Sequence, residues 1–119
     1  CNTVMASRID TVELKAGMPT VAEARVRLAT ELQRGRSGGA GVLKLVHGYG
    51  STGKGGRIRT ALRAELAQLR TAGRVRSVVT GETFSIFDEE TRTLLDRHPA
   101  LRRDADLERG NPGITIVEL

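Results

Sequence analysis

A short apolar stretch, residues 42–46 (VLKLV), leads directly into a glycine-rich segment, residues 47–56 (HGYGSTGKGG). Leucine and isoleucine then recur at helical spacing from Ile58 through Leu62 and Leu66 to Leu69. A glycine-rich loop between a buried strand and a helix brings backbone N–H groups and the positive end of the helix together. The sequence therefore predicts an α/β fold with a phosphate-binding loop at residues 47–56.

The other predicted elements complete this pattern. Residues 8–15 alternate apolar and polar side chains, which is typical of a strand. Thr20 and Glu23 have the spacing of a capping box, and the helix that they open is expected to end before Gly35. The further expected elements are a flexible connector at 34–41, strands at 74–79 and 113–119, and a short helix at 88–97.

The order of these elements predicts an α/β sandwich with a mixed sheet. A chain of 119 residues has room for one compact domain, so residues 1–119 are treated as a single domain. No stretch reaches the roughly 18 apolar residues of a membrane span, and no apolar core of a signal peptide appears near the start, so we expect a cytoplasmic protein and no membrane partner. A single cysteine, Cys1, excludes a disulfide framework and a cysteine-built zinc site.

The charge is unevenly distributed along the chain. Residues 1–81 hold 14 basic and 5 acidic side chains, a net charge of +9, whereas residues 82–119 hold 5 basic and 9 acidic ones, a net charge of −4. Most of the basic residues are arginine, whose planar guanidinium matches the geometry of phosphate. This balance favours DNA or RNA as the partner. With only three aromatic residues, the chain does not fit the proteins that stack bases on an aromatic sheet.

The glycine segment matches two nucleotide-binding patterns in part. Residues 48–54 fit the G-x-x-x-x-G-K portion of a P-loop, but Gly55 follows where magnesium binding requires a serine or threonine hydroxyl. A P-loop-like NTP-binding protein is therefore an alternative. The dinucleotide fingerprint G-x-G-x-x-G is matched from Gly48 to Gly53, but no acidic residue ends a strand about 20 residues later.

The helix after the loop favours a third interpretation, contact with the phosphate backbone of nucleic acid. On a helical wheel three of its arginines, Arg59, Arg63 and Arg70, form one stripe beside the buried face. A basic stripe that continues from a glycine loop suits a polyanion better than one small nucleotide. The residues predicted to contact phosphate are Gly48, Tyr49, Gly50, Ser51, Thr52, Gly53, Lys54, Gly55, Gly56, Arg57, Arg59, Arg63 and Arg70.

Three parts of the chain resemble the motifs of Smr (small MutS-related) domains. Residues 45–50 (LVHGYG), the glycines after them and residues 57–59 (RIR) look like the H-G-x-G-x-G…L-R signature of that family. Residues 12–15 (VELK) and 20–24 (TVAEA) correspond to L-D-L-H-G…T-V-x-E-A, and residues 110–119 (GNPGITIVEL) are similar to the closing G-G-x-G-A-T-x-V-x-L strand. The order of the motifs is more specific than any one of them.

The resemblance implies a two-layer β-α-β-α-β-β sandwich with a mixed sheet, like the C-terminal domain of a bacterial initiation factor. It also implies binding of DNA or RNA, often with nicking or endonuclease activity. The metal requirement stays open, with Mg²⁺ or Mn²⁺ as the candidate cations. A non-catalytic adaptor that docks on nucleic acid or ribosomes is the alternative.

His47, Lys15 and Glu13 are the candidate catalytic residues. His47 could act as a general acid or base near neutral pH, or it could stiffen the turn by bonding a loop carbonyl. Lys15 stands where the family has a histidine and Glu13 where it has an aspartate. If the strands at 8–15 and 42–46 are parallel neighbours, Lys15 lies at the same sheet edge as His47, where it would contact phosphate. Glu13 shares a side of its strand with Lys15, so we expect an ion pair between them.

An acidic segment at about residues 82–109 separates the third and last predicted strands. Asp88, Glu89 and Glu90 fit the first turn of a helix, where acids interact favourably with the helix dipole, better than they fit a metal site. Three roles stay open for the segment: a cover over the basic face, a dimer contact or a surface insertion. The sequence leaves the oligomeric state open between a monomer and a weak dimer.

Overall fold

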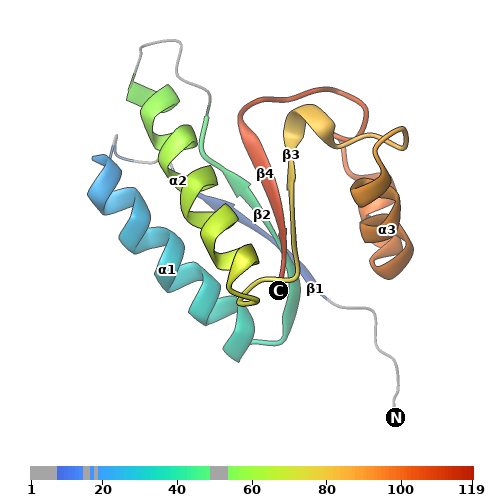
Figure 1. The fold of residues 1–119 in the computed structure, drawn as a ribbon, viewed down its shortest axis with the longest axis horizontal. Coiled ribbons are helices and arrows are strands. Elements are labelled where there is room, and N and C mark those ends of the chain that lie inside the picture. Colours follow the sequence, from blue (N-terminus) through green and yellow to red (C-terminus); the bar gives the residue numbers. More distant parts are fainter. Residues whose placement is uncertain (1–7, 15–16, 18, 49–53) are drawn as a thin grey trace.

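The computed structural model describes residues 8–14, 17, 19–48 and 54–119. Two 3₁₀ helices, Gly81–Thr83 and Pro99–Arg103, flank the third α-helix. None of the helices in these ranges is long and apolar enough to cross a membrane. The elements follow the order β1 (Arg8–Glu13), α1 (Val21–Ser37), β2 (Ala40–Val46), α2 (Lys54–Thr71), β3 (Ser77–Thr80), α3 (Glu89–Arg97) and β4 (Ile114–Glu118) (Figure 1).

The four strands form one mixed sheet in the order β1-β2-β4-β3. β1 and β2 are parallel, whereas β4 runs antiparallel to both of its neighbours, β2 and β3. The last strand of the chain therefore lies inside the sheet, between two strands that precede it by many residues. This arrangement confirms the predicted α/β class, the mixed sheet and the helical segment inserted before the last strand.

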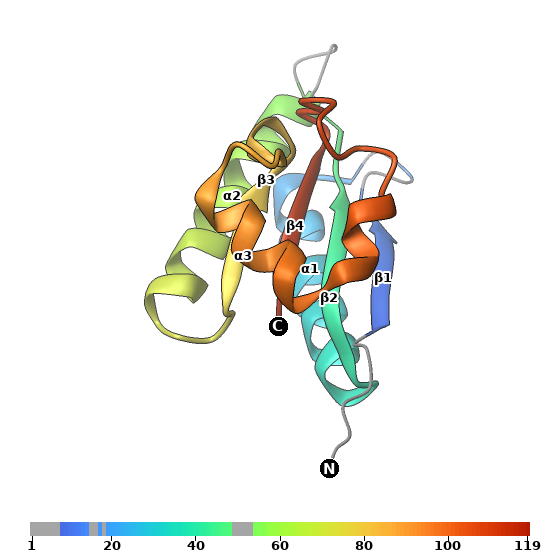
Figure 2. The same ribbon diagram turned by 90° about the vertical axis from the view of Figure 1, so that its right-hand side faces the viewer.

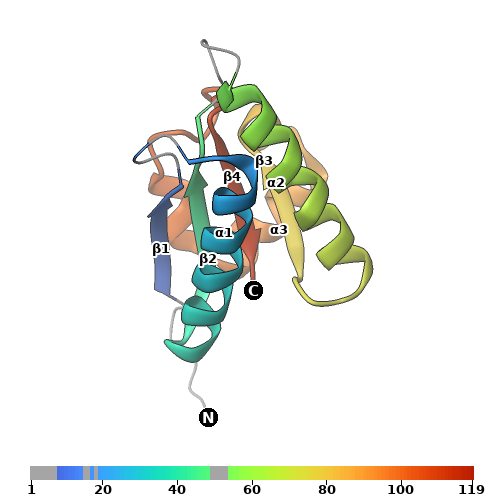
Figure 3. The ribbon, with the colours of Figure 1, turned by 90° about the vertical axis from the view of Figure 1, so that its left-hand side faces the viewer.

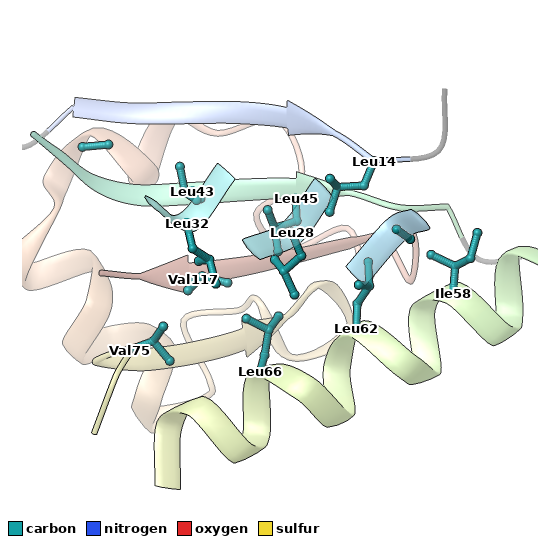
Figure 4. Close-up of a cluster of buried hydrophobic side chains, with 12 residues drawn as sticks. Leu14, Leu28, Leu32, Leu43, Leu45, Ile58, Leu62, Leu66, Val75 and Val117 are labelled. Atoms are coloured by element: carbon teal, nitrogen blue, oxygen red, sulfur yellow. The ribbon is translucent and has the colours of Figure 1, made fainter. Parts of the chain in front are cut away.

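One face of the sheet is covered by α1 and α2, which lie side by side (Figures 1 and 3). The buried stripe predicted for α2 is confirmed, since Ile58, Leu62 and Leu66 are each at most 5% exposed. They pack with Leu28 of α1 and Leu45 of β2 in a single apolar cluster (Figure 4). This packing fixes which sides of α1 and α2 stay available to solvent.

The acidic segment covers the opposite face of the same sheet (Figure 2). Leu94 and Leu95 of α3 are fully buried in a second apolar cluster with Ile114 and Ile116 of β4. Every residue of β4 is buried, because α2 lies over one of its faces and the segment over the other. The segment therefore supplies a core of its own and adds a partial third layer to the predicted two-layer sandwich.

The capping box at Thr20 is confirmed, but the predicted connector at 34–41 is wrong. The Thr20 side chain accepts from the Glu23 N–H at 3.1 Å, and the Thr20 N–H donates to Glu23 Oε1 at 2.8 Å. The helix continues through Gly35 to Ser37, and β2 begins at Ala40. Gly35 is buried against the sheet, where an added Cβ would lie 2.9 Å from Leu119 Cδ1. This glycine permits close helix–sheet packing, so it does not mark the helix end.

Candidate nucleic-acid interface

β1 and β2 end together at one edge of the sheet, as predicted for parallel neighbours. Glu13 pairs in register with Val46, and the Leu14 N–H donates to the Val46 carbonyl at 2.8 Å. The exposed Glu13 side chain therefore lies one residue away from the register position of His47. Lys15 lies outside the described residues, so the expected pair between Glu13 and Lys15 stays a prediction.

His47 follows β2 directly and is buried, with 1% of its surface exposed. Its backbone N–H and that of Gly48 both donate to the Gly113 carbonyl, at 3.0 and 3.1 Å. Gly48 has a φ of +74°, a conformation that favours glycine, and this turn brings its carbonyl within 2.7 Å of the His47 Nδ1. The other ring nitrogen, Nε2, lies 2.8 Å from Thr115 Oγ1 on β4.

These partners define the protonation of the His47 ring. A carbonyl oxygen only accepts, so Nδ1 carries the proton that it shares with Gly48. Burial lowers the pKa of His47, and the nearby positive charges of Arg63 and Arg59 add to that effect against the raising influence of the Gly48 bond. The ring is therefore neutral near pH 7, and its Nε2 accepts from the Thr115 hydroxyl. The bond from Nδ1 to the Gly48 carbonyl is the contact expected of a histidine that stiffens the turn.

Arg63 extends the same network from α2. Its Nε donates to Thr115 Oγ1 at 3.1 Å, and its Nη2 donates to the Ile114 carbonyl at 3.0 Å. Its two terminal nitrogens also bind the Glu82 carboxylate, at 3.0 and 2.7 Å. The Arg63 guanidinium is thus engaged inside the protein, and it connects α2 to β4 and to the start of the acidic segment.

The other two arginines of the predicted stripe also face acids of the 82–109 segment. Arg70 Nη2 lies 3.1 Å from Glu90 Oε2, and Arg59 Nη1 lies 4.0 Å from Glu82 Oε2. The stripe therefore exists as predicted on one side of α2, but the acidic segment lines its far edge. The acidic segment, for which the sequence left three roles open, packs on the sheet and places counter-charges beside the stripe.

The segment also neutralises a lysine of the central strand β2. Lys44, whose side chain is 12% exposed, lies 2.9 Å from Asp104 and 2.6 Å from Asp106. Burial alone would lower the pKa of Lys44, but hydrogen bonds to Asp106 and Asp104 outweigh it and raise that pKa. Part of the positive charge counted in residues 1–81 is therefore internal to the fold.

Two arginines, one on α2 and one on α1, lack such counter-charges. Arg57, in the first turn of α2, and Arg25, on α1, are exposed and have no acidic partner in the described part of the chain. Together with Arg59 they line an open hollow that has Gly56, Ala61 and Ala64 between them. No acidic side chain lines this hollow. The sequence predicts Arg57 and Arg59 as phosphate contacts, whereas nothing in the pattern of α1 singles out Arg25.

Several predicted contacts cannot be placed. Tyr49, Gly50, Ser51, Thr52 and Gly53 lie outside the described residues, and the structure gives Lys54 and Gly55 only as the first two residues of α2. Within the described ranges, no group of three or more histidine, cysteine, aspartate or glutamate residues is arranged to hold a metal ion. Asp88 instead caps α3, with its Oδ2 2.9 Å from the Thr91 N–H. The described residues thus contain no preassembled cluster of three such ligands for Mg²⁺ or Mn²⁺.

The mixed sheet, the helix pair and the glycine turn at His47 make this a small α/β domain that can be compared with solved structures. The chain matches the crystal structure of the Smr domain of Thermus thermophilus MutS2, with 26% sequence identity and a TM-score of 0.56. The match covers 92% of this chain and 96% of that one. No family model matches the sequence, and no curated protein matches it either. The chain is thus an Smr-like domain.

Proposed function

We propose that this Smr-like domain binds the phosphate backbone of nucleic acid, DNA or RNA, at the end of the molecule where β2 stops and α2 begins. The observation that carries the proposal is the first part of α2. Its first turn contains no acid, and Arg57 is exposed there without an acidic partner in the described ranges. Exposed arginines beside the positive end of a helix attract phosphate whatever the base sequence.

The predicted contacts divide into two groups under this proposal. Arg57 is exposed, and Arg59 is partly exposed and lies 4.0 Å from Glu82; in the proposal both contact phosphate, together with the glycine segment that the sequence predicts. Arg63 and His47 have their polar atoms engaged with Thr115 and neighbouring groups, so their part is to hold the turn that presents the binding segment. Binding of nucleic acid therefore depends on both groups, but only Arg57, Arg59 and the glycine segment contact phosphate.

Binding is tested by fluorescence anisotropy with labelled branched DNA and structured RNA at about 50 and about 200 mM salt. The Arg57→Ala/Arg59→Ala protein is expected to bind both more weakly, with a salt slope reduced by about 2, since each lost phosphate contact removes about 1. A double variant that keeps the wild-type affinity and slope would contradict the proposal. Tight magnesium-dependent binding of ATP, with no binding of nucleic acid, would support the NTP-binding alternative.

Cleavage is a separate question, addressed on a denaturing gel with Mg²⁺ or EDTA. The family resemblance names His47, Lys15 and Glu13 as the residues to vary. Because His47 is buried, each variant is first checked for folding by circular dichroism. Cuts that a folded Lys15→Ala or Glu13→Gln protein no longer makes indicate an endonuclease. Intact substrates, at concentrations that shift them on a native gel, indicate a binding module such as an adaptor.

A further inference from the structure

We propose that the nucleic-acid interface extends from α2 across to α1, with Arg25 as a phosphate contact opposite Arg57. This inference rests on the proposed function and deepens it. It places the polyanion over the open hollow that Arg25, Arg57 and Arg59 line, away from the side of α2 that faces the acidic segment.

The lining of this open hollow suits contact with phosphate. Arg25 of α1 and Arg57 and Arg59 of α2 surround an open hollow whose remaining lining consists of small residues, among them Gly56, Ala61 and Ala64. Small side chains let a phosphate come close to the helix surfaces, while the long arginine side chains reach it from the rim. An open hollow with cations on two separate helices fits an extended chain of phosphates better than one enclosed anion.

The distribution of counter-charges points to the same side of α2. On the flank that faces the acidic segment, Glu82 lies beside Arg63 and 4.0 Å from Arg59, and Glu90 lies beside Arg70. A polyanion approaching that flank would meet these carboxylates. On the α1 flank, Arg25 and Arg57 have no acidic partner among the residues described. Arg25 and Arg57 therefore keep unpaired positive charge on this flank, with Glu23 in the first turn of α1 as the acid two residues from Arg25.

The direction of the two helices adds to this field. α1 and α2 begin at the same end of the molecule (Figures 1 and 3), so the positive ends of their dipoles lie together. Arg25 lies near the start of α1, and Arg57 and Arg59 lie near the start of α2. The arginines and the helix dipoles thus favour negative charge at one place on the surface.

The test compares two arginine variants that change the net charge equally. Arg25→Ala removes a proposed contact, whereas Arg103→Ala removes an exposed arginine from the 3₁₀ helix on the other face of the sheet. Anisotropy with the same branched DNA and structured RNA is measured at about 50 and about 200 mM salt. We expect Arg25→Ala to weaken binding several-fold at the lower salt and to reduce the salt slope by about 1, with Arg103→Ala close to wild type.

Each outcome decides the matter. Wild-type affinity in Arg25→Ala, with weak binding in Arg57→Ala, would remove α1 from the interface and leave the proposed function standing. Wild-type affinity in both Arg25→Ala and Arg57→Ala would overturn the proposed function as well. Equal weakening by Arg25→Ala and Arg103→Ala would show an effect of net charge alone and overturn the placement. Arg25→Lys supplies a second readout, since it keeps the charge at an exposed site and should restore most of the salt slope.

Discussion

Arg63 of α2 and Glu82 of the acidic segment are joined by two parallel hydrogen bonds, Nη1 to Oε2 at 3.0 Å and Nη2 to Oε1 at 2.7 Å. The same guanidinium donates to Thr115, which in turn donates to the ring of His47. One arginine therefore links α2, β4, the acidic segment and the turn after β2. Its role differs from that of Arg59, although both lie on the same stripe of the helix.

Arg63→Ala should destabilise the fold more than Arg59→Ala. The first change leaves Thr115 and the Ile114 carbonyl without their charged donor, at a cost of about 1–3 kcal/mol. Arg59 makes one distant ion pair at 4.0 Å, so its loss should cost under about 1 kcal/mol. Urea unfolding of both proteins measures the difference. Equal midpoints would show that the internal bonds of Arg63 contribute little.

The order of helices and strands could be predicted because it depends on local patterns. The spacing of Ile58, Leu62 and Leu66 identifies a buried helix face, and Asp88 precedes a helix that it does cap. The end of α1 was harder to locate, because a glycine that packs against a sheet and a glycine that ends a helix are the same residue in the sequence.

The contacts that define the site depend on residues far apart in the chain. His47 and Thr115 are separated by 68 positions, and Lys44 and Asp104 by 60. A helical wheel places the arginines of α2 on one stripe, but it contains no information about the acids that fold against that stripe. Whether an arginine binds phosphate or a neighbouring carboxylate is decided by this tertiary packing, so the sequence alone could not separate Arg63 from Arg57.

His47 should remain a neutral imidazole with its proton on Nδ1 at pH values where a free histidine titrates. Its pKa is lowered from 6.5, chiefly by burial, so the unfolded chain takes up a proton at higher pH than the folded protein does. The stabilising contribution of His47 is therefore complete above about pH 6.5 and declines as the pH falls below it. Nitrogen NMR shifts of the ring across about pH 5–8 measure the tautomer and the titration. A ring that protonates at or above pH 6.5 would contradict this assignment.

Glu118 should make the fold sensitive to acid. Its buried carboxylate accepts hydrogen bonds from Arg97, His98 and Ser77. Burial alone would raise its pKa, but these bonds outweigh it and lower the pKa from 4.5 to about 2. That lowering corresponds to about 3 kcal/mol of stability, present above about pH 4.5 and lost as the pH falls toward 2.

Glu118→Gln tests this account, with Ser77→Ala as the milder comparison. The glutamine protein should lose about 3 kcal/mol near neutral pH and show a flatter decline of stability in acid. Ser77→Ala removes one neutral donor and should cost about 1 kcal/mol. Urea unfolding at several pH values measures both. An unchanged acid dependence in Glu118→Gln would assign the acid sensitivity to other carboxylates.

Glu82→Gln should strengthen the binding of nucleic acid while it weakens the fold. The pKa of Glu82 is lowered chiefly by its hydrogen bond to Arg63, so the side chain is charged at neutral pH, 4.0 Å from Arg59. Removing this charge beside the proposed interface reduces repulsion of phosphate, and the gain should shrink at high salt, where charges are screened. Asp96→Asn is the matched control, because it removes an exposed carboxylate that pairs with Arg102 on the other face of the sheet. Anisotropy at about 50 and about 200 mM salt should show a several-fold gain for Glu82→Gln alone. An equal gain in both variants would mean that only net charge matters, and no gain in Glu82→Gln would place the bound phosphates away from Arg59.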